Sequence, residues 1–324
     1  MTLQPETASK PIITVTLSPT IDLAFQSTEI RPIRKTRAIE QGTDAGGGGI
    51  NVARVLKELG AEAYAVYLAG GATGLVLNEL VTKSGLPARC IDIAGSTRIS
   101  FTVFEEISGL EYRFVSEGSA LAEAEWQPTL SLLKECEADY VVASGSLPPG
   151  VPVDFYARLG AIARSNGARF ILDTSGRALE AAISAGGIYL TKPSVGEFET
   201  LTHRKFETVG EIAEAAMSFI ASGCVENVAV TMGRDGALLA SRAGTLRLNG
   251  PKVKPVSAVG AGDSFVGGMT AALARGQDVE DAFMLGMAAG AAAVLTPGTQ
   301  LCRREDVERL HAEVVAEGAR ARSM

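Results

Sequence analysis

The sequence predicts an α/β fold in which a doubly wound, mostly parallel sheet is flanked by helices and carries a small β-sheet lid. Two observations indicate the large sheet. Apolar, β-rich runs alternate with helical patterns along most of the 324 residues, and polar or glycine-rich clusters directly follow six of the expected strands. A third observation indicates the lid, because two segments interrupt this alternation. With 46% apolar residues, the chain is long enough to bury a large core.

The first strand is expected at residues 12–17, which are almost all apolar or β-branched. A helix is expected at residues 50–59, where apolar side chains recur at positions 52, 55, 56 and 59 and Gly60 ends the pattern. The remaining strands are expected at residues 63–68, 140–143, 170–172, 188–190 and 228–231. Because helix-compatible stretches separate them, these strands should run parallel.

The two interrupting segments form the lid in this interpretation. Residues 97–115 alternate apolar and polar side chains and turn at Ser108-Gly109, which is typical of an antiparallel hairpin with one buried face. Residues 24–43, rich in Arg and Lys, are expected to add strands. The apolar face needs cover from the core or from a second subunit, so we expect a homodimer through the lid. The expected core comprises residues 12–23, 44–96 and 116–324, and residues 1–11 are expected to be disordered.

Composition argues against several classes of protein. Lys and Arg number 30 and Asp and Glu 37, and the net charge of −7 argues against sequence-independent binding of nucleic acid. The longest mainly apolar stretch, residues 284–295, is too short to span a bilayer, and no apolar signal segment follows the polar N-terminus. The four cysteines lie far apart, which argues against a disulfide framework or a zinc site and favours the cytoplasm. The two histidines lack metal-binding spacing.

A run of four glycines at residues 46–49 opens the first expected helix and is followed by Ile50-Asn51. Glycines without a Cβ let backbone N–H groups approach an anion at a helix N-terminus, although a flexible linker has the same composition. Asn51, and Asp22 at the end of the first expected strand, are able to hydrogen-bond a ligand hydroxyl. On spacing alone, a cap or turn role is favoured over a ligand role for each of them.

A second glycine turn, at residues 258–264, opens a helix whose apolar stripe includes Phe265, Met269 and Leu273. Gly260 and Gly262 expose successive N–H groups that form an anion hole. Asp263 lies in the first turn, where a carboxylate either favours the helix dipole or acts as a general base; the residues alone do not decide between these roles. The GxxxxGK[ST] and GxGxxG nucleotide motifs are absent, so binding of a nucleotide requires a different architecture.

Five motifs occur together in one order: GGGGINVAR at 46–54, AGGATG at 69–74, SGSLPPG at 144–150, DTSG at 173–176 and VGAGD at 259–263. With this ordered set the chain resembles the ribokinase-like (PfkB) carbohydrate kinases from about residue 12 to residue 310. The resemblance implies a ribokinase-like fold and an ATP-dependent sugar-phosphate kinase of glycolysis. The expected reaction transfers the γ-phosphate of MgATP to the C1 hydroxyl of fructose 6-phosphate.

The resemblance also implies roles for individual residues. Asp263 is the expected base that takes the proton of the C1 hydroxyl, beside an anion hole made by Gly260, Ala261 and Gly262. The expected sugar contacts are Asp22, Gly47, Gly48, Gly49 and Asn51. Arg98 and Ser146 are expected to hold the sugar phosphate. Lys35 and Arg37 are basic lid residues that, by the same resemblance, reach the site of a neighbouring subunit.

On the nucleotide side, the resemblance assigns Lys192, Ser194, Thr231, Gly233 and Gly236 to ATP and Glu197 to Mg²⁺ through water. The family's Asn-x-x-Glu reads Ser194-Val195-Gly196-Glu197 here, so the Mg²⁺ contact through position 194 departs from the family pattern. A K⁺ site of mostly backbone carbonyls is implied at Ser257, Val259, Ala293, Thr296, Gly298 and Gln300.

Two alternatives remain open at this stage. The first keeps the chemistry but takes fructose 1-phosphate or tagatose 6-phosphate as the acceptor. The second is a non-catalytic sensor of sugar phosphates or nucleotides that retains the fold. Asp263, directly after the glycines of its turn, argues against a sensor, since a sensor needs no general base.

Overall fold

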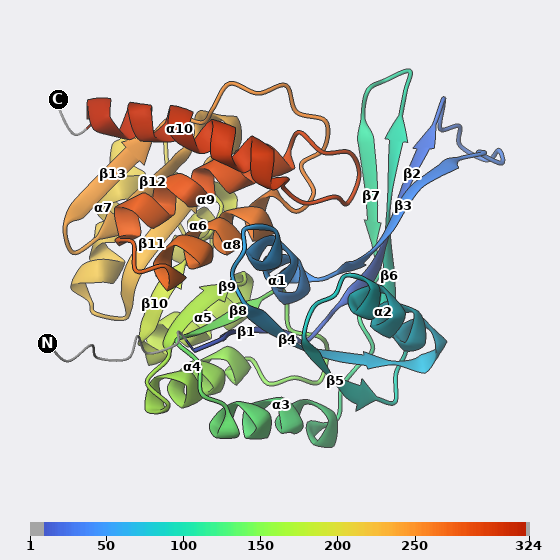
Figure 1. The fold of residues 1–324 in the computed structure, drawn as a ribbon, viewed down its shortest axis with the longest axis horizontal. Helices are drawn as coiled ribbons and strands as arrows, with labels where there is room; N and C mark the ends of the chain where they lie inside the picture. Colours follow the sequence, from blue (N-terminus) through green and yellow to red (C-terminus); the bar gives the residue numbers. More distant parts are fainter. Residues whose placement is uncertain (1–9, 322–324) are drawn as a thin grey trace, which may run out of the picture.

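A nine-stranded sheet forms the centre of the computed structural model, which describes residues 10–321 (Figure 1). Its strand order is β13-β12-β11-β10-β9-β8-β1-β4-β5. The seven strands from β11 to β5 run parallel, and β12 and β13 extend one edge antiparallel. The strands are β1 Ile12–Thr16, β4 Ala63–Gly70, β5 Ala88–Ile93, β8 Tyr140–Ser144, β9 Arg169–Asp173, β10 Ile188–Thr191, β11 Val225–Thr231, β12 Ala237–Ser241 and β13 Gly244–Leu248. The predicted doubly wound, mostly parallel sheet is confirmed.

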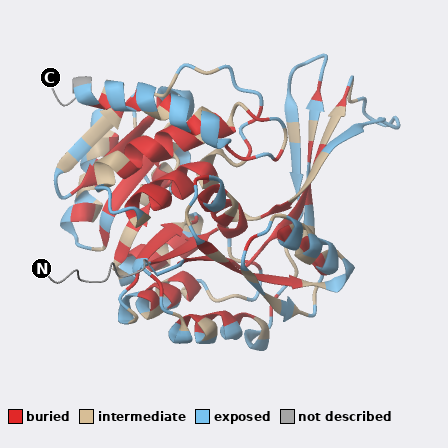
Figure 2. Ribbon diagram, viewed as in Figure 1, coloured by how far each residue is buried: buried red, intermediate tan, exposed pale blue. Residues whose placement is uncertain are grey.

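Helices cover both faces of this sheet and bury two apolar clusters against it (Figure 2). One face carries α1 Gly48–Glu58, α2 Gly71–Lys83, α8 Ala261–Ala274, α9 Val279–Ala293 and α10 Arg304–Ala321. The other carries α3 Glu123–Glu135, α4 Phe155–Ser165, α5 Gly176–Ala185, α6 Val195–Thr202 and α7 Val209–Ala221. A short 3₁₀ turn, η1 Gly233–Asp235, follows β11.

The Ala- and Gly-rich stretch near residue 290 belongs to a tightly packed helix pair, α8 and α9. A Cβ atom on Gly286 would lie 2.5 Å from Met269 Cγ, and one on Gly268 would lie 2.8 Å from the Ala289 Cβ. The small residues therefore serve close helix packing inside the core. None of the helices described in the structure is long and apolar enough to cross a membrane.

Each predicted strand of the large sheet is present, but β5, β12 and β13 were not predicted. In β5 the side chains are only half-buried and include Arg89 and Asp92, because the strand lies at the edge of the sheet. Residues 1–9 of the segment expected to be disordered lie outside the described residues. The described chain begins before β1, and the Lys10 N–H donates to Asp139 Oδ2 at 3.0 Å.

A separate four-stranded sheet, in the order β3-β2-β6-β7, projects from the side of the main body (Figure 1). Its strands are β2 Thr20–Ser27, β3 Ile39–Gly46, β6 Arg98–Glu105 and β7 Glu111–Val115. The predicted hairpin at 97–115 is confirmed. β2 starts at Thr20 and β3 ends at Gly46, so residues 20–23 and 44–46 lie in the small sheet, whereas the sequence placed them in the core.

The apolar side chains of the hairpin lie on the face of the small sheet that the core leaves exposed. Ser100 and Thr102 of β6 are buried, whereas Phe101 is 40% exposed and Phe114 of β7 is 51% exposed. These two rings stack on the outer face with their centroids 4.9 Å apart. The core therefore does not cover the apolar face of the hairpin.

Candidate active site

The two glycine segments, far apart in sequence, meet where α1 and α8 begin. Gly260 caps α8 with φ of 73°, and a Cβ there would lie 2.5 Å from Leu301 Cδ2, so this turn requires glycine. Asp263 lies in the first turn of α8. Its Oδ2 accepts a hydrogen bond of 2.8 Å from Asn51 Nδ2 of α1. Asp263 is thereby held at the helix N-terminus with a defined orientation.

Asp263 has the proton affinity that a general base needs near neutral pH. Burial, and after it the neighbouring carboxylate of Asp173, raise the pKa of Asp263 to about 7. The hydrogen bond from Asn51 and the charge of Lys192 act in the opposite direction. A carboxylate with a pKa near the working pH is an effective acceptor for a hydroxyl proton.

Lys192 brings a buried positive charge to the same place. It follows β10, is 6% exposed, and lies with Nζ 3.3 Å from Asp173 Oδ1. A Cβ atom on Gly262 would lie 3.4 Å from Lys192 Nζ, so the ammonium group borders the glycine turn of α8. Burial lowers the pKa of Lys192, but the surrounding carboxylates, Asp173 first, outweigh it and the pKa is raised. The ammonium group therefore stays charged beside the glycine turn of α8.

Asp22 lies in the small sheet rather than at the end of the first core strand as predicted. It belongs to β2, pairs with Asp44 and Ser100 across the strands, and is 4% exposed. Its Oδ1 is buried without a hydrogen-bond partner among the described residues. Burial raises the pKa of Asp22 to about 6, against the charges of Arg113 and Arg98. A buried acceptor of this kind suits a ligand that brings its own hydroxyl donors.

Sequence reasoning missed Arg113, whose charge has the largest lowering effect on the pKa of Asp22. The alternation of apolar and polar residues in the hairpin could have identified Arg113. Arg113 stands between Tyr112 and Phe114 in β7, so its side chain belongs to the opposite face from the exposed Phe114. Asp173, the first residue of DTSG, was also not assigned a role, although it ends β9 beside Lys192.

A cavity of about 610 Å³ opens between the small sheet and the loop that follows β8, and it includes both predicted phosphate-binding residues, Arg98 and Ser146. The Arg98 guanidinium donates to Ser18 O at 2.9 Å and to Ser116 O at 3.3 Å, while its buried Nε has no partner among the described residues. Lys35 and Arg37 do not line this cavity; they lie in the exposed loop between β2 and β3.

The glycines at 47–49 are required by packing. A Cβ on Gly48 would lie 2.1 Å from Ser144 Oγ, and one on Gly49 would lie 2.5 Å from Thr16 Oγ1. Gly47 has φ of 107°. The Ile50 N–H donates to Thr16 Oγ1 at 2.9 Å and is therefore already paired. The start of α1 thus lies directly on β1 and β8, which sets the position of Asn51.

The predicted nucleotide residues lie together at the carboxyl ends of β10 and β11. Ser194 and Thr231 form a parallel bridge, and the Thr231 N–H donates to Pro193 O at 3.0 Å. Glu197 is the third residue of α6 and pairs with Ser194. The Ser194 N–H and Oγ–H donate to Glu197 Oε2 at 2.7 and 2.8 Å, and this capping box leaves Glu197 Oε1 for other partners. Gly233 and Gly236 lie in and directly after η1.

The residues expected to bind K⁺ also come together. Ser257 Oγ donates to Gly298 O at 3.1 Å, and Thr296 Oγ1, which has one hydrogen to share, lies 2.7 Å from Ala293 O and 2.8 Å from Gln300 O. The Val259 N–H donates to Ser257 Oγ at 3.2 Å. The hydroxyls of Ser257 and Thr296 therefore fix three backbone carbonyls within one loop cluster, next to the glycine turn of α8.

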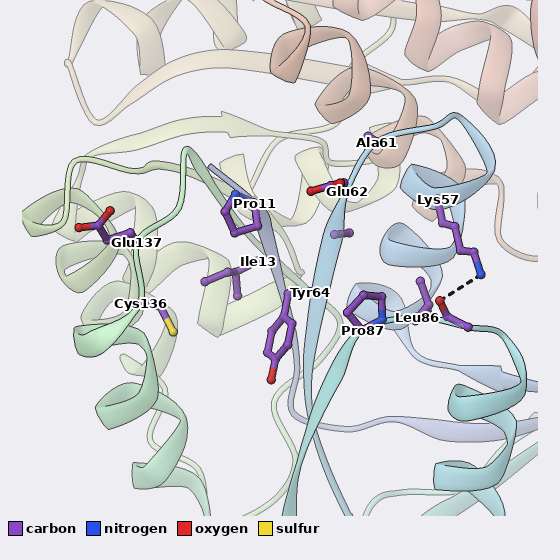
Figure 3. A pocket seen from close by; sticks show the side chains of 12 residues that line it. Pro11, Ile13, Lys57, Ala61, Glu62, Tyr64, Leu86, Pro87, Cys136 and Glu137 are labelled. Atoms are coloured by element: carbon purple, nitrogen blue, oxygen red, sulfur yellow. Dashed lines mark hydrogen bonds between the residues drawn. The ribbon is translucent and has the colours of Figure 1, made fainter. Parts of the chain in front are cut away.

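A second cavity, of about 590 Å³, lies at the opposite, amino end of the strands (Figure 3). Apolar residues such as Ile13, Leu86 and Pro87 line it, and Lys57 at its rim donates to Gly85 O at 3.1 Å. None of the predicted site residues borders it. The carboxyl ends of the parallel strands, where a ligand crevice is expected, carry the candidate site instead.

Comparison with known proteins gives matches over most of the chain. Residues 13–306 match the family model described as pfkB family carbohydrate kinase. The chain is 44% identical over 308 residues to the ATP-dependent 6-phosphofructokinase isozyme 2 of Mycobacterium tuberculosis, covering 94% of this chain and 90% of the relative. It is 32% identical over 308 residues to a 1-phosphofructokinase of Borreliella burgdorferi, covering 94% of this chain and 98% of that protein.

The crystal structure of phosphofructokinase-2 from Escherichia coli in complex with fructose-6-phosphate superposes with a TM-score of 0.89 at 38% identity. The match covers 94% of this chain and 99% of that one. A structure of the same E. coli protein in complex with potassium gives a TM-score of 0.90 at 39% identity, with the same coverage. The similarity therefore extends over both the large and the small sheet.

Proposed function

Because this chain belongs to the pfkB family of carbohydrate kinases, we propose that it transfers the γ-phosphate of ATP to the C1 hydroxyl of fructose 6-phosphate. The observation that carries the proposal is Asp263, a carboxylate with a raised pKa held by Asn51 at the glycine turn of α8 and facing the charge of Lys192. The 44% identity to a 6-phosphofructokinase, against 32% to a 1-phosphofructokinase, supports the choice of acceptor.

In the proposed reaction Asp263 accepts the proton of the C1 hydroxyl while that oxygen attacks the γ-phosphorus. The bond from the γ-phosphorus to the β–γ bridging oxygen breaks, and ADP leaves with that oxygen. The N–H groups of the Gly260–Gly262 turn and the ammonium of Lys192 balance the charge on the transferred group. Asp22 accepts and Asn51 donates hydrogen bonds that orient the sugar. Arg98 and Ser146 hold the phosphate of the sugar in the 610 Å³ cavity. Positioning and charge balance supply most of the catalysis.

The donor set fits a Mg²⁺ ion that arrives with the nucleotide. Three carboxylates, those of Asp173, Glu197 and Asp263, act on Lys192, so negative charge exceeds positive charge at this point. Hard carboxylate oxygens, contacted directly or through water, suit Mg²⁺, and Glu197 Oε1 and Asp173 are the groups that would hold it. The ion would neutralise charge on the ATP phosphates. The carbonyl cluster of Ala293, Gly298 and Gln300 would in the same way hold K⁺.

We place the dimer interface on the outer face of the small sheet, where Phe101 and Phe114 stack in the open. Burying this face against a second copy covers aromatic surface that the core leaves exposed. The basic loop with Lys35 and Arg37 lies outside its own cavity, so in such a dimer it is free to reach the cavity of the other copy. We assign the enzyme to the cytoplasm, where its four free cysteines stay reduced.

A single-turnover assay tests the proposed acceptor. The enzyme is mixed with ATP and, in turn, with fructose 6-phosphate, fructose 1-phosphate and tagatose 6-phosphate. The proposal expects phosphate transfer to fructose 6-phosphate with the highest kcat/KM of the three. A higher kcat/KM for another sugar would replace the acceptor, and transfer to none of them would indicate a sensor.

A further inference from the structure

The cavity that holds Arg98 and Ser146 contains a second arginine with no role so far, Arg177. Arg177 is the second residue of α5, which starts directly beyond β9, and β9 is the neighbour of β8 in the sheet (Figure 1). Its side chain is exposed to solvent. Within residues 10–321 it has neither a hydrogen bond nor an ion pair, so all five of its N–H donors are available to a ligand.

The start of α5 is fixed relative to Ser146. The Gly145 N–H donates to Asp173 O at 3.0 Å, and Thr174 Oγ1 donates to Gly145 O at 2.9 Å. These bonds join the loop after β8, which carries Ser146, to the loop after β9, which leads to Arg177. Because both loops are tied at the carboxyl ends of β8 and β9, the backbone that carries Arg177 keeps a constant position relative to Ser146.

The charge of the cavity favours an anion. Its charged lining residues are Arg98, Arg177 and Glu117, and the rest are small, hydroxyl-bearing or apolar. Glu117 forms no ion pair with either arginine in the part of the chain that the structure describes. Two of the Arg98 nitrogens already donate hydrogen bonds to Ser18 O and Ser116 O. Arg98 alone therefore has too few free N–H donors to hydrogen-bond every oxygen of a phosphate. A second guanidinium on the same cavity supplies the missing donors.

We propose that Arg177 binds the phosphate of the sugar-phosphate substrate together with Arg98 and sets the preference for phosphorylated over unphosphorylated sugar. The inference rests on the proposed function, which assigns this cavity to the sugar phosphate. Arg177 does not touch the reacting atoms in this assignment, so its contribution appears in substrate binding and leaves the chemical step unaltered.

The experiment compares the wild type with Arg177→Ala and Arg177→Lys, using ATP with fructose 6-phosphate or with unphosphorylated fructose. In Arg177→Ala we expect KM for fructose 6-phosphate to rise about 10- to 100-fold, as for loss of a hydrogen bond to a charged group. The value of kcat/KM for fructose and the KM for ATP should stay within twofold. KM for fructose 6-phosphate in Arg177→Lys should lie between those of the wild type and Arg177→Ala, since lysine keeps the charge but lacks the planar guanidinium. Arg158→Ala is the matched control, because Arg158 is exposed on α4 and pairs with Asp154 outside the cavity.

The inference is overturned if Arg177→Ala leaves KM for fructose 6-phosphate within twofold, or weakens fructose and fructose 6-phosphate equally. The inference about Arg177 can be tested even if the proposed acceptor is wrong. Should the wild type prefer another sugar phosphate, the same ratio is measured with that sugar and its unphosphorylated form. Should it phosphorylate none, calorimetric titration with fructose 6-phosphate decides. A tenfold loss of affinity in Arg177→Ala sustains the inference, and equal affinity, or no binding to the wild type, overturns it.

Discussion

Asn51 Nδ2 donates a 2.8 Å hydrogen bond to Asp263 Oδ2, joining the first helix of the chain to a helix 212 residues away. The bond lowers the pKa of Asp263 against the effect of burial, and so keeps a largely desolvated carboxylate ionised nearer to neutral pH. The same amide belongs to the predicted sugar-binding set. Asn51 thus links the position of the proposed base to the position of the acceptor.

Replacing this donor should shift the pH dependence of the reaction. In the wild type, kcat/KM for the sugar phosphate should fall as the pH drops below about 7, because protonated Asp263 cannot accept the hydroxyl proton. Asn51→Leu removes the bond that favours the carboxylate, so the pKa of Asp263 should rise and the acid limb should move to higher pH by up to about one unit. Profiles of kcat/KM between pH 5.5 and 9 measure this. If the acid limb of the profile does not shift in Asn51→Leu, the limb does not report the protonation of Asp263.

Asp263 should cost stability in the pH range where it works. Its folded-state pKa of about 7 lies above the ordinary value of 3.8, so the folded protein binds this proton more tightly than the unfolded chain. The stabilisation is present below pH 3.8 and is lost as the pH rises through 7. Asp263→Asn should therefore be more stable than the wild type at pH 8 by about 1–4 kcal/mol, and the difference should vanish near pH 4. Denaturant unfolding at both pH values, with the exposed Asp92→Asn as control, checks the sign; a less stable variant at pH 8 would refute it.

Arg98 should act on the sugar side of the site alone. We expect Arg98→Ala to raise KM for fructose 6-phosphate about 10- to 100-fold, because a charge-assisted bond to the phosphate is lost, and to leave KM for ATP unchanged. Steady-state kinetics with each substrate varied in turn gives both values. Because Arg98 also supports the backbone at Ser18 and Ser116, unfolding temperatures accompany the kinetics. An equal rise in the two KM values would contradict the assignment.

The outer face of the small sheet should hold two copies together. Phe101→Glu places a charge in the exposed aromatic pair and should convert the proposed dimer into a monomer at micromolar concentration, measured by sedimentation velocity. KM for fructose 6-phosphate should rise in the monomer, because Lys35 and Arg37 are withdrawn from the other copy. Val315→Glu, an exposed apolar position on α10, is the matched control. A wild type that sediments as a monomer would remove the dimer.

Much of the architecture was predictable because it rests on local patterns. Buried parallel strands such as β1 and β8 are short runs of mostly apolar or β-branched residues, and the start of α1 is marked by glycines that packing against Thr16 and Ser144 requires. The edge strand β5 escaped prediction because its half-exposed side chains give no continuous apolar run. Asp22 was placed on the wrong element because the pairing of Thr20 with Arg98 is a long-range contact that no local pattern announces.

The candidate site was only partly predictable for the same reason. Glycine turns signal backbone that approaches a ligand, so Asp263 and its neighbours could be found from the sequence. Single polar residues such as Arg113 and Arg177 have no local signature, and they gain a role only where strands or loops meet around the cavity. The apolar face of the hairpin was predicted, but whether the core covers it depends on the orientation of the whole small sheet.

The most direct test of the account is the turnover of Asp263→Asn, which keeps the shape of the side chain and removes the proton acceptor. We predict that kcat with fructose 6-phosphate and MgATP falls by at least about 10²–10⁴-fold, while the affinities for both substrates stay within a few-fold of the wild type. A variant that turns over at a rate close to that of the wild type would contradict the role of Asp263 and, with it, the proposed mechanism.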